Sequence, residues 1–174
     1  ISWYQYLKDR NLKNMNDVAL FYRGTKITFQ EMFDKADELI KSMAKIGLHI
    51  GDEIGVCVTN SPELVYIILA ANRLGIKVNC FGAQFNKKYL SNIIDGISNK
   101  IIFISDDNYE SLRSILLDKK IDNVVLTSLA DSLPKNPKEC DEYEPELDKY
   151  YHIDNKCNYY KSVDNRIKLL SEFI

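Results

Sequence analysis

Strand-like runs alternate with helix-length amphipathic segments over the first 130 residues, and this alternation most strongly limits the fold. Apolar or β-branched runs predict strands at 53–58, 77–81, 101–104 and 124–126. Residues with helical spacing of apolar side chains fill the intervals, at about 62–74, 87–97 and 109–117. Strands separated by helices of this length indicate βαβ units and a mostly parallel sheet. Because the strands are apolar on both sides, we expect a three-layer α/β domain with helices on both faces.

The N-terminal part predicts a hairpin followed by a capped helix. Residues 18–22 and 27–28 have strand character and flank a turn at 23–26. Thr28 stands three residues before Glu31, which is the spacing of a capping box. The amphipathic helix behind this box ends at Gly47, a residue that tolerates the left-handed conformation found at helix ends.

A second long helix is predicted to begin at the segment Asn60-Ser61-Pro62-Glu63. The segment supplies a polar cap, a proline in the first turn and an acid at the positive end of the helix dipole. Gly75 is placed to stop the helix. We therefore interpret these residues as structural ones that set where the helix starts and ends.

Composition changes near residue 134. Three of the four prolines lie in 134–145, six acids lie in 139–148, and five of the eleven tyrosines lie in 143–160. Regular alternation returns only at 163–173, which suggests a short helix. With 174 residues the chain is long enough for one domain with its own core. We expect a compact domain at 1–133 and an irregular acidic, tyrosine-rich extension at 134–174.

Charge and cysteine usage exclude several classes of protein. The net charge is -2, so the basic surplus typical of nucleic-acid binding is missing. No apolar run approaches the 18 or so residues of a spanning helix. The four cysteines contain no C-x-x-C pair, which argues against a zinc site. We expect reduced thiols, with Cys57 and Cys80 buried in strands, and a cytoplasmic protein.

The residues themselves indicate no catalytic, cofactor-binding or metal-binding site. The seven glycines form neither G-x-G-x-x-G nor a phosphate-loop pattern. His49 falls in a predicted turn and His152 in the tyrosine-rich extension, and neither has a positioned partner that would make it a base. Asp106 and Asp107 follow an apolar strand, where with Ser105 they predict the start of a helix.

Several short motifs nevertheless occur in a fixed order between about residues 18 and 130. They are Ala19-Leu20, Gly24, Ile27-Thr28-Phe29-Gln30-Glu31-Met32, Gly47-Leu48, Gly51-Asp52, Asn60-Ser61-Pro62-Glu63 and Gly75. Each is weakly specific alone. Together their order and spacing resemble the N-terminal part of the adenylate-forming enzymes, which include AMP-forming acyl- and aryl-CoA synthetases, luciferases and adenylation domains of peptide synthetases.

The resemblance implies a two-step reaction that depends on ATP, magnesium and CoA. A carboxylic acid and ATP give an acyl-adenylate, and a thiol such as CoA then takes the acyl group. The family's phosphate loop, ribose-binding aspartate and C-terminal lid lie in later segments that this sequence does not contain. The chain is therefore expected to be an N-terminal fragment, inactive alone, whose partners are the phosphate-loop subdomain and lid of its own polypeptide. An apolar face exposed by their absence would allow self-association.

Two features bear on the subfamily, and two alternatives to an acyl-CoA synthetase-like fragment stay open. Residues 79–83 read Asn-Cys-Phe-Gly-Ala and lack two prolines that many relatives have there, which leaves the subfamily undecided. The helix ending Ala-Ala-Asn-Arg-Leu-Gly looks more like bacterial acyl-CoA synthetase-like proteins than peptide-synthetase domains. The alternatives are a stand-alone, non-catalytic α/β binding module and an adenylation domain of the peptide-synthetase or carrier-protein loading type.

Overall fold

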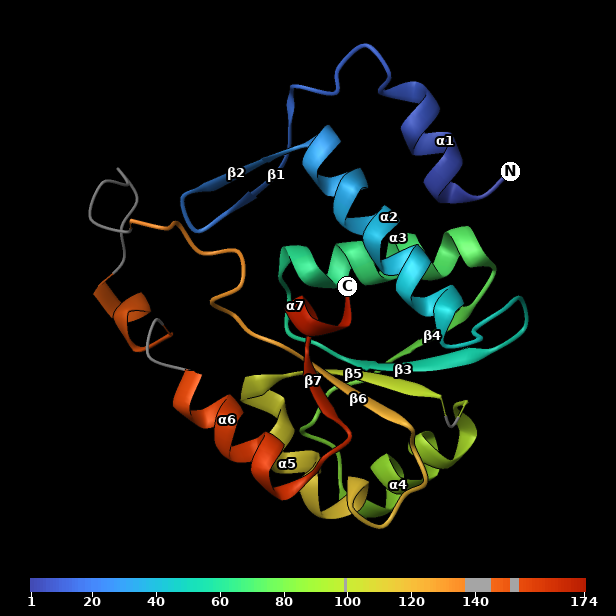
Figure 1. The fold of residues 1–174 in the computed structure, drawn as a ribbon, viewed down its shortest axis with the longest axis vertical. Coiled ribbons are helices and arrows are strands. Elements are labelled where there is room, and N and C mark those ends of the chain that lie inside the picture. The colour runs from blue at the N-terminus through green and yellow to red at the C-terminus, as the bar shows by residue number, and fades with distance from the viewer. Residues whose placement is uncertain (99, 137–144, 151–153) are drawn as a thin grey trace.

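Five parallel strands form the main sheet of the computed structural model, which describes residues 1–98, 100–136, 145–150 and 154–174 (Figure 1). The strand order is β4-β3-β5-β6-β7. The strands are β3 (Glu53–Cys57), β4 (Lys77–Cys80), β5 (Ile101–Ser105), β6 (Asn123–Thr127) and β7 (Ile167–Leu169).

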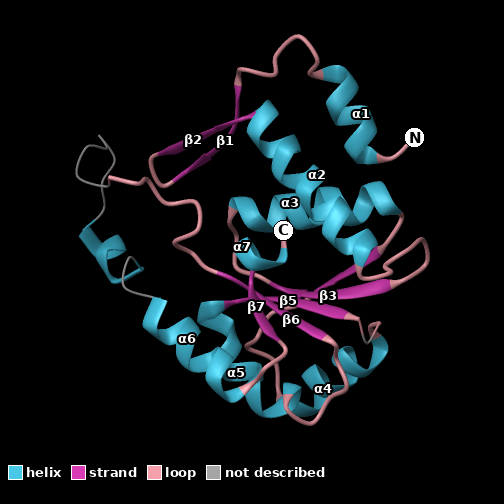
Figure 2. Ribbon diagram, viewed as in Figure 1, coloured by secondary structure: helices cyan, strands magenta, loops and turns pink. Residues whose placement is uncertain are grey.

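Helices cover both faces of this sheet (Figure 2). One layer contains α1 (Trp3–Arg10), α2 (Phe29–Lys45), α3 (Pro62–Leu74) and α7 (Leu170–Phe173). The other contains α4 (Lys87–Gly96), α5 (Asp106–Leu116) and α6 (Asp154–Val163), and a 3-10 helix spans Pro145–Tyr150. The predicted three-layer α/β architecture with a parallel sheet is confirmed.

The central strand β5 separates two hydrophobic cores. Ile101 and Phe103 point into the core beneath α2 and α3, whereas Ile102 and Ile104 point into the core beneath α4 and α5. This is the two-residue alternation of a strand, here with apolar side chains on both faces. All five residues of β5 are buried, which explains why its sequence is a nearly continuous apolar run.

The N-terminal hairpin pairs β1 (Val18–Tyr22) with β2 (Thr25–Thr28). Arg23 and Gly24 form its turn, both with positive φ, as tight hairpin turns require. The Tyr22 hydroxyl donates a hydrogen bond of 3.1 Å to the carbonyl oxygen of Leu129, in the loop after β6. The hairpin is therefore anchored to the loops at one end of the main sheet.

The order in which the chain adds strands to the sheet reverses at one place, although all the strands stay parallel. The chain runs from β3 outward to β4, returns past β3 to β5, and then continues to β6 and β7. The connections through α3 and α4 consequently lie on opposite faces of the sheet (Figure 2). The carboxyl ends of β3 and β5 flank this reversal, which is where open parallel sheets usually bind ligands.

The C-terminal segment returns to the sheet. The sequence suggested one helix over 163–173, but β7 occupies the middle of this range and pairs with β6, with Val124 opposite Ile167. The short helix α7 follows, and its Phe173 ring packs edge-on against Phe103, 6.0 Å between ring centres. The proposed domain boundary at residue 133 stays a prediction. Most of the acidic run at 139–148, together with His152, lies outside the described residues.

The expectation that both strand cysteines are buried holds for only one of them. Cys57 is buried as expected, but Cys80 is exposed because it ends β4, an edge strand of the sheet. Within the described part of the chain, no helix is long and apolar enough to cross a membrane.

Candidate functional site at the carboxyl edge of the sheet

Polar side chains meet where β3 and β5 end. The backbone amide of Thr59, just after β3, donates to Ser105 Oγ at the end of β5, at 3.1 Å. The Thr59 hydroxyl donates to Asp107 Oδ2, at 2.8 Å. Asp107 lies in the first turn of α5. These bonds join two strands and a helix at the reversal of the sheet.

Asn108 completes this group from the first turn of α5. Its side-chain amide donates to Ser105 Oγ at 3.0 Å, to the Cys57 carbonyl at 3.3 Å and to Thr59 Oγ1 at 3.4 Å. We call Cys57, Thr59, Ser105, Asp107 and Asn108 the switch-point cluster. Helices α3 and α5 both begin at this edge, so their amino ends place partial positive charge there.

A second group, which we call the buried-acid group, consists of Glu63, Asp106, Ser128, Asp131 and Ser132. The Ser132 hydroxyl donates to Glu63 Oε1 in a short contact. Ser128 donates its hydroxyl to Asp106 Oδ2 at 3.0 Å and its backbone amide to Asp131 Oδ2 at 2.8 Å. The loop after β6 is thereby bonded to the first turns of α3 and α5.

The surroundings of these acids shift their pKa values upward. Burial raises the pKa of Glu63 and of Asp106, although serine donors partly oppose the shift. The pKa of Asp131 is raised to about 7, first by its loss of hydration and then by the charges of Glu63 and Asp106. Asp131 nevertheless keeps an exposed surface, so it is the member through which solvent or a ligand would meet the group.

The switch-point cluster offers hydrogen-bonding groups, and its one thiol is a poor nucleophile. Burial raises the pKa of the Cys57 thiol to about 12, so the thiolate is not populated near neutral pH. Glu63 Oε2, Asp106 Oδ1 and Thr127 Oγ1 are buried without a hydrogen-bond partner. Among the described residues no three His, Cys, Asp or Glu side chains are grouped to hold a metal ion.

Two of the sequence-derived motif residues form a local helix cap rather than part of either group. Thr28 and Glu31 cap α2: the Glu31 amide donates to Thr28 Oγ1 at 3.2 Å, and Glu31 Oε2 accepts from the Thr28 amide at 2.8 Å. The Glu31 pKa is lowered chiefly by that backbone bond. This pair acts locally at the start of its own helix.

The glycine motif lies at the opposite, amino edge of the sheet. Gly47, Gly51 and Gly75 all have positive φ, and the Gly51 amide donates to the Gly75 carbonyl at 3.2 Å. Asp52 accepts from the His49 amide and from Lys100 Nζ, both at 2.9 Å, and these bonds lower its pKa. The residues join the two turns that precede β3 and β4.

The segment Asn60–Glu63 lies at the carboxyl edge, but it differs from the expected helix cap. Ser61 is the cap residue of α3 and makes no side-chain cap bond, while Asn60 precedes it and is exposed. The polar cap predicted for this segment is therefore wrong in its bonding: Ser61 occupies the cap position without a side-chain bond, and Asn60 lies outside the helix. Glu63 does more than complement the helix dipole, because it is buried and bonded to Ser132.

Sequence reasoning missed Thr59, Asn108 and Ser132. Thr59 and Asn108 could have been found from position alone, since polar residues that follow neighbouring parallel strands meet at one edge. Ser132 carries no comparable local signal, because its partner Glu63 is 69 residues away.

Comparison with known proteins agrees with this architecture. The model of the family described as "AMP-binding enzyme" matches residues 7–161. An acetyl-coenzyme A synthetase of Dictyostelium discoideum is 29% identical over 124 residues, covering 67% of this chain and 18% of that protein. An acetyl-coenzyme A synthetase of Pseudoalteromonas translucida is 25% identical over 148 residues, covering 76% of this chain and 23% of that protein. The chain thus spans about a fifth of the length of these relatives.

Solved structures share the fold at lower identity. Coronafacic acid ligase from Pectobacterium brasiliense aligns with a TM-score of 0.67 and 11% identity, over 82% of this chain and 28% of that one. The anthranilate CoA ligase AuaEII aligns with a TM-score of 0.63 and 19% identity, over 72% of this chain and 25% of that one. The family match covers most of the chain, and with the parallel sheet it shows that the chain belongs to the AMP-binding enzyme family.

Proposed function

We propose that this chain serves an AMP-forming acid–thiol ligase, in which ATP activates a carboxylic acid as an acyl-adenylate and CoA or another thiol accepts the acyl group. The family match over residues 7–161 is the observation that carries the proposal. The similar acetyl-coenzyme A synthetases and the CoA ligases among the structural neighbours support it. We further propose a cytoplasmic location and, for the whole enzyme, ATP, magnesium and CoA as its cofactors and co-substrates.

Within this enzyme the chain is proposed to act as scaffold rather than as catalytic machinery. Triphosphate binding needs converging backbone amides or a cationic clamp, usually a glycine-rich loop at a helix start. Here Gly47, Gly51 and Gly75 serve turns at the amino edge, and α3 and α5 begin with acids instead. The described residues therefore do not fit ATP–magnesium, and no chemical step is assigned to them.

The partners proposed for the chain are a phosphate-loop subdomain and a lid of the same enzyme. Exposed apolar side chains of α1 and β1 offer surface for such packing: Trp3 is 66% exposed, Val18 49% and Phe21 52%. Val18 and Phe21 lie on the hairpin strand β1, and a two-stranded sheet is marginal without further support. The same side chains would favour self-association when those partners are missing.

A chimaera tests the proposed function. Residues 7–161 would replace the matching segment of the D. discoideum acetyl-coenzyme A synthetase, and pyrophosphate release would be measured with ATP–magnesium, a panel of carboxylic acids and CoA. We expect acid-dependent release from the chimaera and none from the relative lacking that segment. A chimaera that melts cooperatively but releases no pyrophosphate would contradict the scaffold role.

A further inference from the structure

A small cavity lies beside the buried-acid group, among α2, α3, α7 and the loop after β6. Its volume is about 180 Å³, and Leu39, Glu63, Tyr66, Ser132 and Leu170 are among the residues that line it. Leu39, Tyr66, Leu170 and Ile174 form the apolar part of its wall, beside the buried carboxyl group of Glu63. An apolar cavity of about 150 Å³ is large enough to bind benzene, so this one has room for a small organic molecule.

Glu63 is the buried carboxyl group of the cavity. Only 3% of the residue is exposed, and its Oε1 already accepts the Ser132 hydroxyl. Its Oε2 has no hydrogen-bond partner among the described residues. A buried carboxyl oxygen without a partner costs on the order of 1–3 kcal/mol, which a bound hydrogen-bond donor would recover.

The charges around the cavity select the type of donor. Asp131 adds a second carboxyl group to the wall. Lys35 also lines the cavity, but its Nζ bonds Glu38 Oε2 at 2.8 Å and its side chain is 48% exposed, so its charge lies toward solvent. An anion would meet two acids here. A cationic donor would instead form charge-assisted bonds, and the Tyr66 ring adds an aromatic surface for cation binding.

We propose that this cavity binds a small organic ammonium ion, with its charged group at Glu63 and Asp131 and its apolar body against Leu39, Tyr66 and Leu170. The apolar walls favour a body about the size of a benzene ring, and the two acids favour a primary ammonium over a neutral alcohol. This site is independent of the proposed ligase function, because it requires neither ATP nor a thiol.

The test is an NMR titration of residues 1–174 with benzylammonium chloride, with benzyl alcohol at the same ionic strength as the comparison. We expect saturable shifts around Glu63 and Leu170 with benzylammonium, and at least about tenfold weaker binding of the alcohol, the value of one charge-assisted bond. Glu63→Gln should weaken benzylammonium binding by a similar factor. Glu110→Gln, an exposed acid on α5 in the other helical layer, should leave it unchanged.

A further variant keeps the test decisive if Glu63→Gln does not fold. Ile174 lines the cavity and is 36% exposed, so Ile174→Trp should fill the space while both acids keep their identity. It should abolish the benzylammonium shifts. Equal binding of the ammonium and the alcohol, no saturable ammonium binding, or undiminished binding by folded Glu63→Gln or Ile174→Trp would each overturn the proposal.

Discussion

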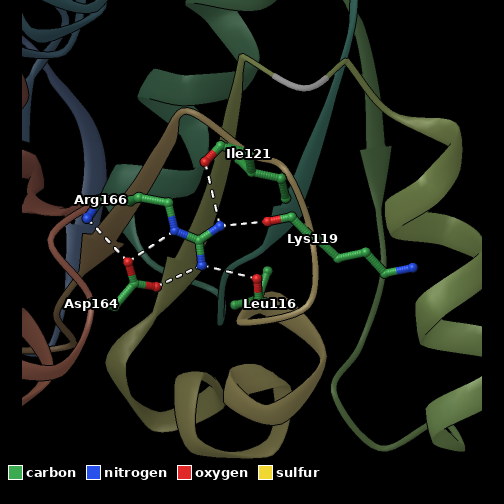
Figure 3. Close-up of polar contacts among 5 residues, drawn as sticks. All are labelled: Leu116, Lys119, Ile121, Asp164 and Arg166. Carbon is green, nitrogen blue, oxygen red and sulfur yellow. Dashed lines mark hydrogen bonds and ion pairs between the residues drawn. The ribbon is translucent and has the colours of Figure 1, made fainter.

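Arg166 and Asp164 form a bidentate ion pair at the turn before β7 (Figure 3). Arg166 Nε lies 2.9 Å from Asp164 Oδ1, and Nη2 lies 2.7 Å from Oδ2. The same guanidinium donates to the carbonyl oxygens of Leu116 at 2.9 Å, Lys119 at 2.7 Å and Ile121 at 3.4 Å. One side chain therefore ties the turn before β7 to the end of α5 and the loop that leads to β6.

Replacing this guanidinium should destabilise the whole domain. The Asp164 side chain is only 3% exposed, and Arg166 lowers its pKa through hydrogen bonding. Arg166→Ala leaves that carboxylate buried without its charged partner, with only the backbone amide of residue 166 still donating to it at 3.0 Å, and such losses cost about 3–5 kcal/mol. The free energy of unfolding, measured in urea by circular dichroism, should fall by that order.

Replacing Arg166 by lysine separates the effect of its hydrogen-bond geometry from the effect of its positive charge. Arg166→Lys keeps the positive charge but cannot bond both carboxylate oxygens and three carbonyl groups at once, so it should recover only part of the loss. The control is Arg113→Lys, because both contacts of Arg113 are to exposed side chains: a 3.3 Å bond to Glu110 and the Tyr159 ring, whose centre lies 5.6 Å from the guanidinium carbon. We expect little change in its urea midpoint. Equal urea midpoints for Arg166→Lys and the unmodified chain would contradict a role for the bidentate geometry.

Two alanine substitutions test which helix start depends on its cap. Thr28 takes part in a complete capping box, so Thr28→Ala should lower the free energy of unfolding by about 1 kcal/mol. Asn60 is exposed and precedes a helix whose cap makes no side-chain bond, so Asn60→Ala should be nearly neutral. Urea denaturation of both variants makes the comparison. A larger loss for Asn60→Ala would restore the capping role expected from its sequence.

The strands of the main sheet were predictable because burial on both faces leaves a nearly continuous apolar run. The predicted runs 53–58 and 101–104 differ by one residue from β3 and β5 as observed. The strand β7 was not predictable in the same way. It has three residues, too few to show a period, and it is defined by pairing with β6, more than 40 residues earlier.

The candidate site was only partly accessible from sequence for a related reason. Capping boxes and glycine turns join residues a few positions apart, so their spacing is visible in the sequence. The bonds of Thr59 to Asp107 and of Glu63 to Ser132 span 48 and 69 residues. The sheet topology brings these partners together, and their burial, which shifts their pKa values, follows from packing rather than from local pattern.

The buried carboxyl of Glu63 should make stability depend on pH in a definite direction. Its pKa in the unfolded chain is near the ordinary 4.5, and burial raises it in the folded state. Between these two values the folded state binds more protons, so the free energy of unfolding falls as pH rises through that window. Glu63→Gln cannot ionise and should lack this part of the decline.

Urea midpoints at pH 5 and pH 8 measure the effect. The unmodified chain should lose more stability than Glu63→Gln between the two, while Glu110→Gln should follow the unmodified chain. Asp106 and Asp131 also have raised pKa values and add to the decline in every variant, so the difference between the profiles reports Glu63 together with its effect on Asp131. Asp52 and Asp164 contribute only at more acidic pH, because their pKa values are lowered below the ordinary 3.8. Parallel pH profiles for Glu63→Gln and the unmodified chain would show that Glu63 ionises normally.

The chain alone should neither bind ATP–magnesium tightly nor release pyrophosphate. Its closest glycines are four residues apart, at 47, 51 and 55, and no lysine follows them in a phosphate-loop pattern. At the carboxyl edge, Asp106 and Asp107 in the first turn of α5 and Glu63 in that of α3 compete with phosphate for the helix amino ends. Stabilising a reacting phosphate also needs preorganised positive groups. Calorimetric titration with ATP–magnesium should show no saturable heat, and pyrophosphate release with mixed carboxylic acids and CoA should match the blank. Micromolar affinity for ATP would place a nucleotide site within these residues.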